Sequence, residues 1–262
     1  ALGFRRVVLA REMSAGEIAA CVGQGCEIEV FVHGALCMCV SGQCYLSAML
    51  GGRSGNRGLC AQPCRLPFQA EGGKPYALSL KDLSLADRIA ELTEMGVASL
   101  KIEGRMKSIH YVATVVKVYR EAMDAYERDP QHFQVLPRWL TELEKISHRP
   151  YTKGFSVSRP TDADQVYSHS SNTQTHDFIG FVRSYDAEKK IAWVEQRNHF
   201  RVGQTVEFLQ PHGPVVTQTL TSLTDEEGKP IEAANHAQML VGIAVDTPLE
   251  AYSLMRREVS HA

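Results

Sequence analysis

Seven cysteines lie between Cys21 and Cys64, and none follows in the rest of the 262-residue chain. Four of them have the spacing Cys37-x6-Cys44-x15-Cys60-x3-Cys64. Four thiolates from one segment suit a zinc ion or an iron–sulfur cluster, because both accept four cysteine ligands. Structural zinc sites usually contain two tight cysteine pairs, whereas only Cys60 and Cys64 are close here. The spacing therefore favours a cluster, with zinc as the alternative.

The other cysteines leave alternatives open. Cys39 lies two residues after Cys37 and could replace it as a ligand. One cysteine could instead act as a nucleophile with His33, but five neighbouring cysteines are more than a thiol protease needs. An odd cysteine count without a secretory signal argues against a disulfide framework and predicts a reducing, cytoplasmic compartment.

Ionisable residues follow four strands that we predict in the first half of the chain. In a parallel barrel, ligands meet the side chains at the C-terminal ends of the strands, so these positions are candidates for a substrate site. The Glu103-Gly104-Arg105 sequence joins an acid and a base, and the arginine suits capture of a carboxylate or phosphate. The residues that follow the four strands are Arg11 and Glu12; His33; Lys81 and Asp82; and Glu103, Arg105 and Lys107.

Local charge points to an anionic partner more clearly than the net charge of -2 does. Such groups could contact RNA phosphates or a small dicarboxylate, or they could simply be solvated. The two basic groups are Arg53, Arg57 and Arg65, with no acid among them, and Lys101, Arg105, Lys107 and Lys117.

The elements that position these residues alternate between strand and helix, which is typical of parallel βα units. We predict strands at 7–10, 27–32, 76–80 and 97–102, and helices at 14–22, 85–95 and 108–128. Ser14 with Glu17 forms a capping-box pattern, Ser84 is the predicted N-cap of the second helix, and Gly96 its end.

Residues 1–130 are therefore expected to be α/β, the C-terminal part of a (β/α) TIM-like barrel with a Cys-rich insertion over about 34–73. The first residues, Ala1-Leu2-Gly3-Phe4, lack a Met and resemble a helix end with a Gly cap. We expect upstream residues or a partner chain to supply the missing barrel half.

Residues 131–175 are expected to contain a helix at 136–146 and a polar linker. Residues 176–262 show a period of two with turn signals, which predicts a small antiparallel β-barrel. Its predicted strands are 178–182, 191–196, 205–210, 215–223 and 239–245.

Composition excludes several classes of protein. With 44% hydrophobic and 22% charged residues, the chain is neither collagenous nor disordered. No stretch approaches the roughly 18 apolar residues of a membrane-spanning helix, so no membrane partner is expected.

Several segments resemble the collagenase-like peptidase family U32 over nearly the whole chain. They are residues 29–37 (EVFVHGALC), 41–47 (SGQCYLS), 56–65 (NRGLCAQPCR), 99–108 (SLKIEGRMKS), 148–155 (HRPYTKGF) and 198–203 (NHFRVG).

The resemblance is greatest to family members that hydroxylate tRNA. It implies that Cys37, Cys44, Cys60 and Cys64 hold a [4Fe–4S] cluster. It also implies oxygen-independent hydroxylation of the wobble uridine to 5-hydroxyuridine, with prephenate as co-substrate and tRNA as partner.

On this basis we predict site roles. His33, Glu103 and Arg105 are the catalytic candidates, the first two for proton transfer. The candidates for contacts to the RNA or a small carboxylate are Arg11, Glu12, Arg57, Arg65, Lys81, Asp82, Lys101 and Lys107.

Two other functions stay open at this point. The family's older description is a protease, although the sequence contains no Ser-His-Asp arrangement or His-Glu-x-x-His motif that we can identify. A non-catalytic RNA-binding module stapled by a Cys₄ metal site is the third hypothesis.

Overall fold

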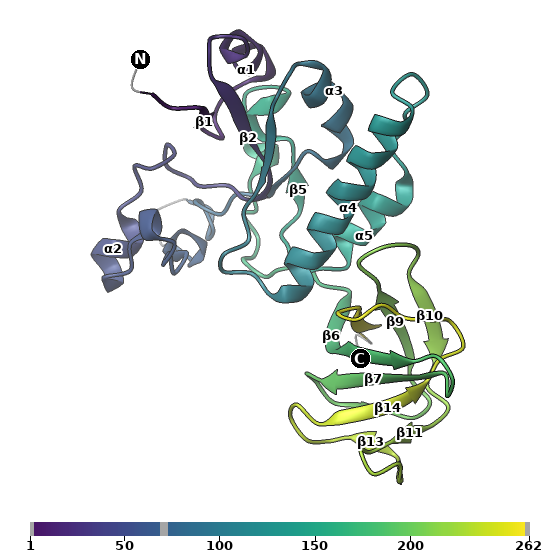
Figure 1. The fold of residues 1–262 in the computed structure, drawn as a ribbon. Helices are drawn as coiled ribbons and strands as arrows, with labels where there is room; N and C mark the ends of the chain where they lie inside the picture. Colours follow the sequence, from purple (N-terminus) through teal and green to yellow (C-terminus); the bar gives the residue numbers. More distant parts are fainter. Residues whose placement is uncertain (1–2, 69–72, 260–262) are drawn as a thin grey trace. The chain divides into compact units, whose positions relative to one another are not determined.

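The computed structural model describes residues 3–68 and 73–259, which divide into two compact units, 1–173 and 174–262 (Figure 1). Ala1, Leu2 and residues 69–72 of the predicted insertion lie outside the described residues. Each unit is described by itself.

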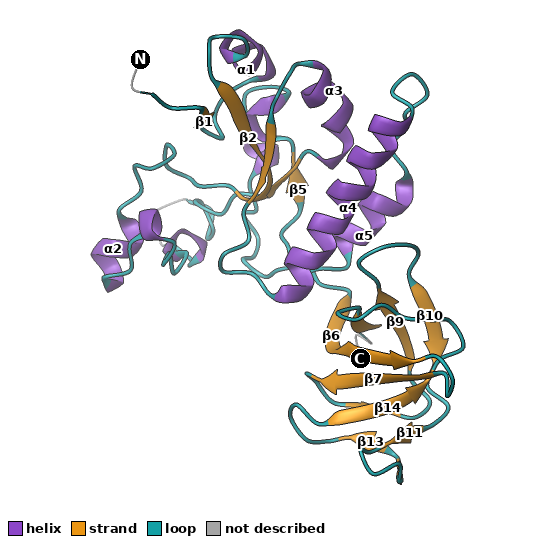
Figure 2. Cartoon of the chain, viewed as in Figure 1, coloured by secondary structure: helices purple, strands orange, loops and turns teal. Residues whose placement is uncertain are grey.

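The first unit contains a mixed sheet centred on β2 (Glu27–Ala35) (Figure 2). β2 pairs in parallel with β1 (Arg6–Val8) and β4 (Ser99–Ile102), and antiparallel with β3 (Asp82–Ser84). β3 in turn pairs in parallel with β5 (Tyr151–Thr152). The α/β class of this unit is confirmed, but the described strands form an open sheet, so the TIM-like barrel stays a prediction.

The predicted helices of this unit are shorter than their patterns suggested, with one exception, and the helix at residues 46–51 was not predicted. The 20-residue helix α4 (Ile109–Arg128) has Ser108 as its N-cap and lies within the predicted range. The others are α1 (Ala15–Cys21), α2 (Leu46–Gly51), α3 (Ile89–Glu94) and α5 (Pro137–Glu144). Short 3₁₀ turns occupy Gly55–Arg57, Pro63–Arg65, Ala86–Arg88, Gly154–Ser156 and Asp162–Asp164.

The alternation along β2 explains how the sheet and helices pack. Ile28, Val30 and Val32 are buried, and they join apolar side chains of the helices in the core of this unit. Glu29 and Phe31 point to the opposite face, since successive side chains of a strand alternate. That second face carries the charged and aromatic groups discussed below.

Local sequence signals succeed at two helix ends. Ser14 and Glu17 form the predicted capping box of α1. Gly96, with φ +90°, follows α3 as its predicted end. Both signals are confirmed because they depend only on neighbouring backbone geometry.

The predicted strand at 76–80 is wrong. Residues 75–78 form a turn, Leu80 makes an isolated bridge to Gln165, and the strand begins at Asp82. Ser84 consequently ends β3 instead of capping a helix. The apolar run was short enough to pack as a turn, and the antiparallel pairing of β3 breaks the expected parallel order.

The second unit is antiparallel throughout its described pairings. Its eight-stranded curled sheet has the order β10-β9-β15-β6-β7-β14-β11-β12, and β8 pairs with β13. The strands are β6 (His176–Asp186), β7 (Ile191–Gln196), β8 (Phe200–Arg201), β9 (Thr205–Leu209), β10 (Val216–Thr219), β11 (Leu223–Thr224), β12 (Pro230–Ile231), β13 (Ala233–Ala234), β14 (Leu240–Ala244) and β15 (Leu254–Glu258). A β-rich C-terminal unit is confirmed, and a closed barrel stays a prediction.

The strands of this unit differ from the prediction at several points, and the two-residue strands β8, β12 and β13 were not predicted. The predicted strand 215–223 is divided into β10 and β11, which pair with different neighbours. β15 was not predicted, since three of its five residues are charged. Arg256 in β15 is nevertheless fully buried and paired with Glu207 at 2.7 Å.

No helix of the described residues has the length and apolar character that a bilayer crossing requires.

The packing of α5 yields a stability prediction. Leu143 is 1% exposed in the core, whereas Leu140 on the same helix is 40% exposed. We expect Leu143→Ala to lower the free energy of unfolding of this unit by about 2–5 kcal/mol and Leu140→Ala by about 0.5 kcal/mol or less. Urea unfolding followed by Trp139 fluorescence, in a Trp193→Phe background, measures both, and equal costs would contradict the packing described.

Candidate functional site: a pocket lined by cysteines

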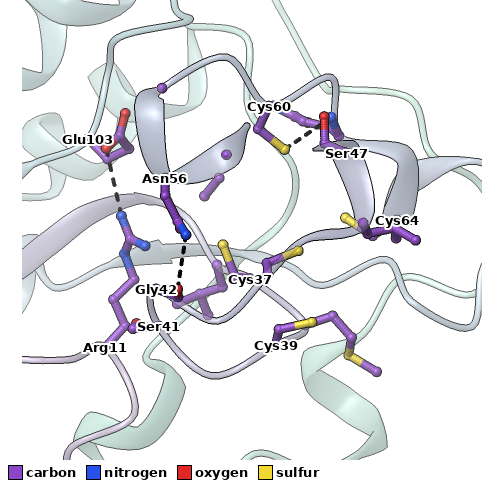
Figure 3. A pocket seen from close by; sticks show the side chains of 18 of the residues that line it. Arg11, Cys37, Cys39, Ser41, Gly42, Ser47, Asn56, Cys60, Cys64 and Glu103 are labelled. Atoms are coloured by element: carbon purple, nitrogen blue, oxygen red, sulfur yellow. Dashed lines mark hydrogen bonds and ion pairs between the residues drawn. The ribbon is translucent and has the colours of Figure 1, made fainter. Parts of the chain in front are cut away.

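A pocket of about 690 Å³ lies in the first unit, where the segment 35–65 faces the residues that follow β1 and β4. Figure 3 shows thiols of this segment around the hollow, with Arg11 and Glu103 nearby. The structure therefore brings together all four predicted ligands and the alternative one. The cysteines that line the pocket are Cys37, Cys39, Cys44, Cys60 and Cys64.

The thiols influence one another electrostatically. Burial raises the pKa of Cys37 and of Cys64, and neighbouring cysteines add to that rise. A hydrogen bond with Cys44 raises the pKa of Cys39. The positive charges of Arg65 and Arg149 oppose the effect of burial on the pKa of Cys64. Among the described residues, no three potential ligands lie close enough together to hold a single metal ion.

An acid between two bases forms another part of the pocket wall. The Arg11 guanidinium lies 3.8 Å from Glu103 Oε2, and Arg105 Nε lies 3.8 Å from Glu103 Oε1. Arg11 also stacks 3.8 Å above the Phe31 ring, a cation–π contact that fixes its direction. This wall offers one carboxylate and two guanidinium groups to a ligand.

Two glycines let the chain approach these side chains closely. A Cβ on Gly34, where φ is +126°, would lie 2.7 Å from the Cβ of Glu103. A Cβ on Gly58 would lie 2.6 Å from Arg105 Nη1. Glycine is therefore required where β2 meets Glu103, and at Gly58 the positive φ of +77° favours glycine.

Glu12 holds the cysteine segment from outside the pocket. Its Oε1 accepts hydrogen bonds from the backbone N–H of Ser41 at 2.8 Å and from the Ser41 hydroxyl at 3.1 Å. Within the segment, Asn56 donates to the carbonyl of Gly42 at 3.0 Å. Glu12 therefore supports the loop and does not line the pocket, so its predicted substrate contact has no geometric support.

Arg65 lines the pocket, and its two terminal nitrogens bind backbone carbonyls. It is buried, and it donates to the carbonyl of Leu36 at 2.9 Å and to that of Leu80 at 2.8 Å. Burial lowers the pKa of its guanidinium. Arg65 thus ties two chain segments together while it also lines the pocket, and its substrate contact stays a prediction.

Asp82 is fully buried and pairs with an arginine that the sequence analysis did not single out. Its carboxylate accepts from Arg149 Nη1 at 2.8 Å and from the Arg149 backbone N–H at 3.1 Å. Lys107 Nζ, which lines the pocket, lies 3.9 Å from the same carboxylate. The predicted position of Asp82 after a strand was wrong, because Asp82 begins β3.

His33 lies inside β2 instead of after it, and it is 1% exposed. Three tyrosine rings surround it, and the hydroxyls of Tyr119 and Tyr151 lie 3.4 Å from its two ring nitrogens. Burial, assisted by nearby positive charges, lowers the pKa of His33 to about 3. The imidazole is neutral at pH 7 and outside the pocket lining, so its predicted proton transfer has no geometric support.

Three further candidates do not line the pocket. Arg57 is exposed on its 3₁₀ turn, and Lys81 is half-buried beside β3. Lys101 in β4 forms an ion pair with Glu29 at 2.8 Å. The pocket wall therefore retains Arg11, Arg65, Glu103, Arg105 and Lys107 from the predicted set, together with the cysteines.

Sequence reasoning missed Arg149, Gln62 and Phe31. Arg149 belongs to the 148–155 segment that carries the family resemblance, which was the available signal. Nothing in the spacing connects it with Gln62, which is 87 residues away.

The low pKa of His33 gives a pH prediction. A histidine in the unfolded chain has a pKa near 6.5. Between about pH 6.5 and pH 3, His33 therefore binds a proton in the unfolded state but not in the folded state. The free energy of unfolding should fall as pH decreases through this range. We expect His33→Gln to flatten the decrease between pH 7 and pH 5 in urea unfolding, and parallel curves for both proteins would contradict this.

The contact between Gly34 and Glu103 gives a second prediction. Gly34→Ala should destabilise the unit by more than Gly25→Ala. Gly25 also has a positive φ of +86°, but a Cβ at this position would meet no atom within 4 Å. The Gly25→Ala control measures the free-energy cost of placing a side chain on a left-handed backbone, which is about 1–2 kcal/mol. Trp139-monitored unfolding measures both, and equal costs would show that Glu103 can move away freely.

Comparison with known proteins places these features in a family. The model of peptidase family U32 matches residues 1–165, and that of the U32 C-terminal domain matches residues 174–256. The tRNA hydroxylation protein P1 of Bacillus subtilis is 41% identical, over 97% of this chain and 64% of that protein. The chain thus spans less than two thirds of the length of that relative.

Other relatives carry different names. The 23S rRNA 5-hydroxycytidine C2501 synthase of Escherichia coli is 36% identical over 62% of this chain and 27% of that protein. The collagenase of Porphyromonas gingivalis is 30% identical over 82% of this chain and 62% of that protein.

Among solved structures, the C-terminal domain of a U32-family protein from Geobacillus thermoleovorans is 43% identical. It covers 31% of this chain and 99% of that domain, with a TM-score of 0.30. The two family matches together account for nearly every residue, and on that basis the chain belongs to peptidase family U32.

Proposed function

We propose that this chain is the substrate-modifying part of an RNA hydroxylase that converts the wobble uridine of tRNA to 5-hydroxyuridine without molecular oxygen. The observation that carries the proposal is the pocket in which five cysteines face an Arg-Glu-Arg wall. Relatives named as tRNA and rRNA hydroxylation proteins support an RNA substrate.

The cofactor in this proposal is a [4Fe–4S] cluster held by Cys37, Cys44, Cys60 and Cys64. All four line the pocket, and their spacing in the sequence, with only one tight pair, favours a cluster over zinc. Cys39, which is exposed, is the alternative ligand. A bound cluster supplies one-electron chemistry next to the substrate.

The chain's own residues bind and orient the substrate. Arg11 is 15% exposed and Arg105 is 64% exposed, so the first presents a fixed guanidinium and the second a mobile one. Both suit a phosphate or the carboxylates of a small co-substrate, for which prephenate is our proposal. Glu103 lies between them and is the remaining candidate to accept or return a proton at its carboxylate oxygens. The volume falls within the range of ordinary ligand pockets.

Peptide hydrolysis is less well supported by the geometry. The histidine nearest in sequence to the cysteines, His33, is buried among tyrosines, so no imidazole of β2 reaches the pocket to activate a thiol. The experiment below also distinguishes the proposal from peptidase activity and from a non-catalytic zinc module.

The test combines cofactor analysis with nucleoside analysis of tRNA. The full-length gene product, purified without oxygen, should be brown and contain iron and sulfide. A strain lacking the gene, with any redundant pathway removed, should lose wobble 5-hydroxyuridine. Cys60→Ala should fail to restore it, whereas Cys26→Ala, outside the pocket lining, should restore it.

Three results would contradict the proposal. They are a colourless protein with stoichiometric zinc, unchanged 5-hydroxyuridine in the deletion strain, and peptide cleavage that survives Cys60→Ala and Cys64→Ala.

A further inference from the structure

We propose that Arg149 is a positioning residue for the cysteine site. Together with the buried Arg65 and the partly buried Lys107, it would form a cationic layer that fixes the Cys60–Cys64 segment and offsets the negative charge of the thiolates. The inference rests on the proposed cluster and adds to it three residues that do not ligate metal.

The first step is the fixed orientation of Arg149. The residue is 4% exposed, and the Asp82 carboxylate engages both its Nη1 and its backbone N–H. One carboxylate thus holds both the backbone and the end of the side chain of Arg149, which restricts the direction of the guanidinium. Its remaining terminal nitrogen, Nη2, then donates to Gln62 Oε1 at 2.7 Å.

The second step is the place of Gln62 in the chain. It lies between Cys60 and Cys64, and its backbone is left-handed, with φ +56°. Such a conformation is uncommon for a non-glycine residue and persists when surrounding contacts enforce it. The backbone N–H of Gln62 donates to Cys60 Sγ at 3.3 Å. Through its hydrogen bond to the Gln62 side chain, Arg149 therefore stabilises the turn that orients Cys60 and Cys64.

Arg65 provides a second tie to the same turn. Next in sequence to Cys64, it donates to the carbonyl of Leu36, which immediately precedes Cys37. The two arginines thereby connect Cys60, Cys64 and Cys37 to one buried framework.

The third step is charge. Arg149 and Lys107 pair with the buried Asp82 carboxylate, and Arg65 interacts with it electrostatically. Among the described residues Asp82 is the one buried carboxylate, so the layer is cationic. Four thiolates bring more negative charge than the core of an iron–sulfur cluster cancels. Buried charges act strongly because little water screens them, and net charge near a cluster sets its reduction potential. The layer should therefore hold the potential above the value that the thiolates alone would give.

The experiment compares four variants of the whole gene product, purified anaerobically. Gln62→Ala removes the hydrogen bond from Arg149 to Gln62 but leaves the Asp82–Arg149 ion pair intact. Arg149→Met removes both that hydrogen bond and the positive charge. Arg149→Lys keeps the charge without the planar fork. Arg256→Met is the matched control, since it removes an equally buried arginine from the second unit.

The readouts are iron and sulfide per chain, the rate of iron loss to a chelator, and the midpoint potential from a redox titration followed by electron paramagnetic resonance. We expect Gln62→Ala and both Arg149 variants to lose iron about 10-fold faster or more. Arg149→Met should also shift the potential to more negative values, Arg149→Lys should not, and Arg256→Met should change neither.

The outcomes separate the inference from the proposed function. If Gln62→Ala and Arg149→Met lose iron at the wild-type rate and keep the wild-type midpoint potential, the inference is overturned, whereas the proposed cluster is not. A wild-type protein without iron would overturn both. If Arg149→Met fails to fold, Gln62→Ala decides, because Gln62 is half-buried and its loss leaves no buried charge unpaired.

Discussion

A carboxylate with no access to water is the constraint on which the first unit depends. Asp82 begins a three-residue strand and has no exposed surface. Removing the partner of a buried charge costs about 3–5 kcal/mol, so the chain must deliver a cation to this point. Arg149 does so from 67 residues away, and the same contact brings β5 alongside β3. One ion pair thereby aligns the end of the unit with its middle.

The pocket is assembled from segments that no local rule connects. β1 leads into Arg11, the cysteine segment supplies the thiols, and the residues after β4 supply Glu103 and Arg105. Gly34 and Gly58 allow these segments to touch. Apolar burial on one face of β2 holds the sheet against the helices, which leaves the opposite face to carry the charges.

Sequence patterns predicted those features whose causes are local. The capping box at Ser14 and the long amphipathic helix α4 depend on neighbours within a few residues. Spacing alone also identified the cysteines that line the pocket. It failed at residues 76–80, where a short apolar run forms a turn, and at β15, whose charged residues conceal a strand.

Side-chain burial was the main quantity that the sequence did not reveal. Asp82 and His33 were expected to face a substrate because they were placed at strand ends, and Arg65 because it lies in a basic group. Each is instead buried, and contacts with other parts of the chain engage much of its polar surface. The identity of a buried partner depends on tertiary contacts, as the distance between Gln62 and Arg149 in the sequence shows.

That separation also orders events while the protein is being made. The cysteines between residues 37 and 64 leave the ribosome well before Arg149 is synthesised. Until then the Cys60–Cys64 turn lacks the guanidinium that fixes it, and Asp82 has no counter-charge with which to enter the core. The thiols therefore reach their final arrangement only after translation has passed β5, so any step that needs the assembled pocket waits until the last part of the first unit has been made.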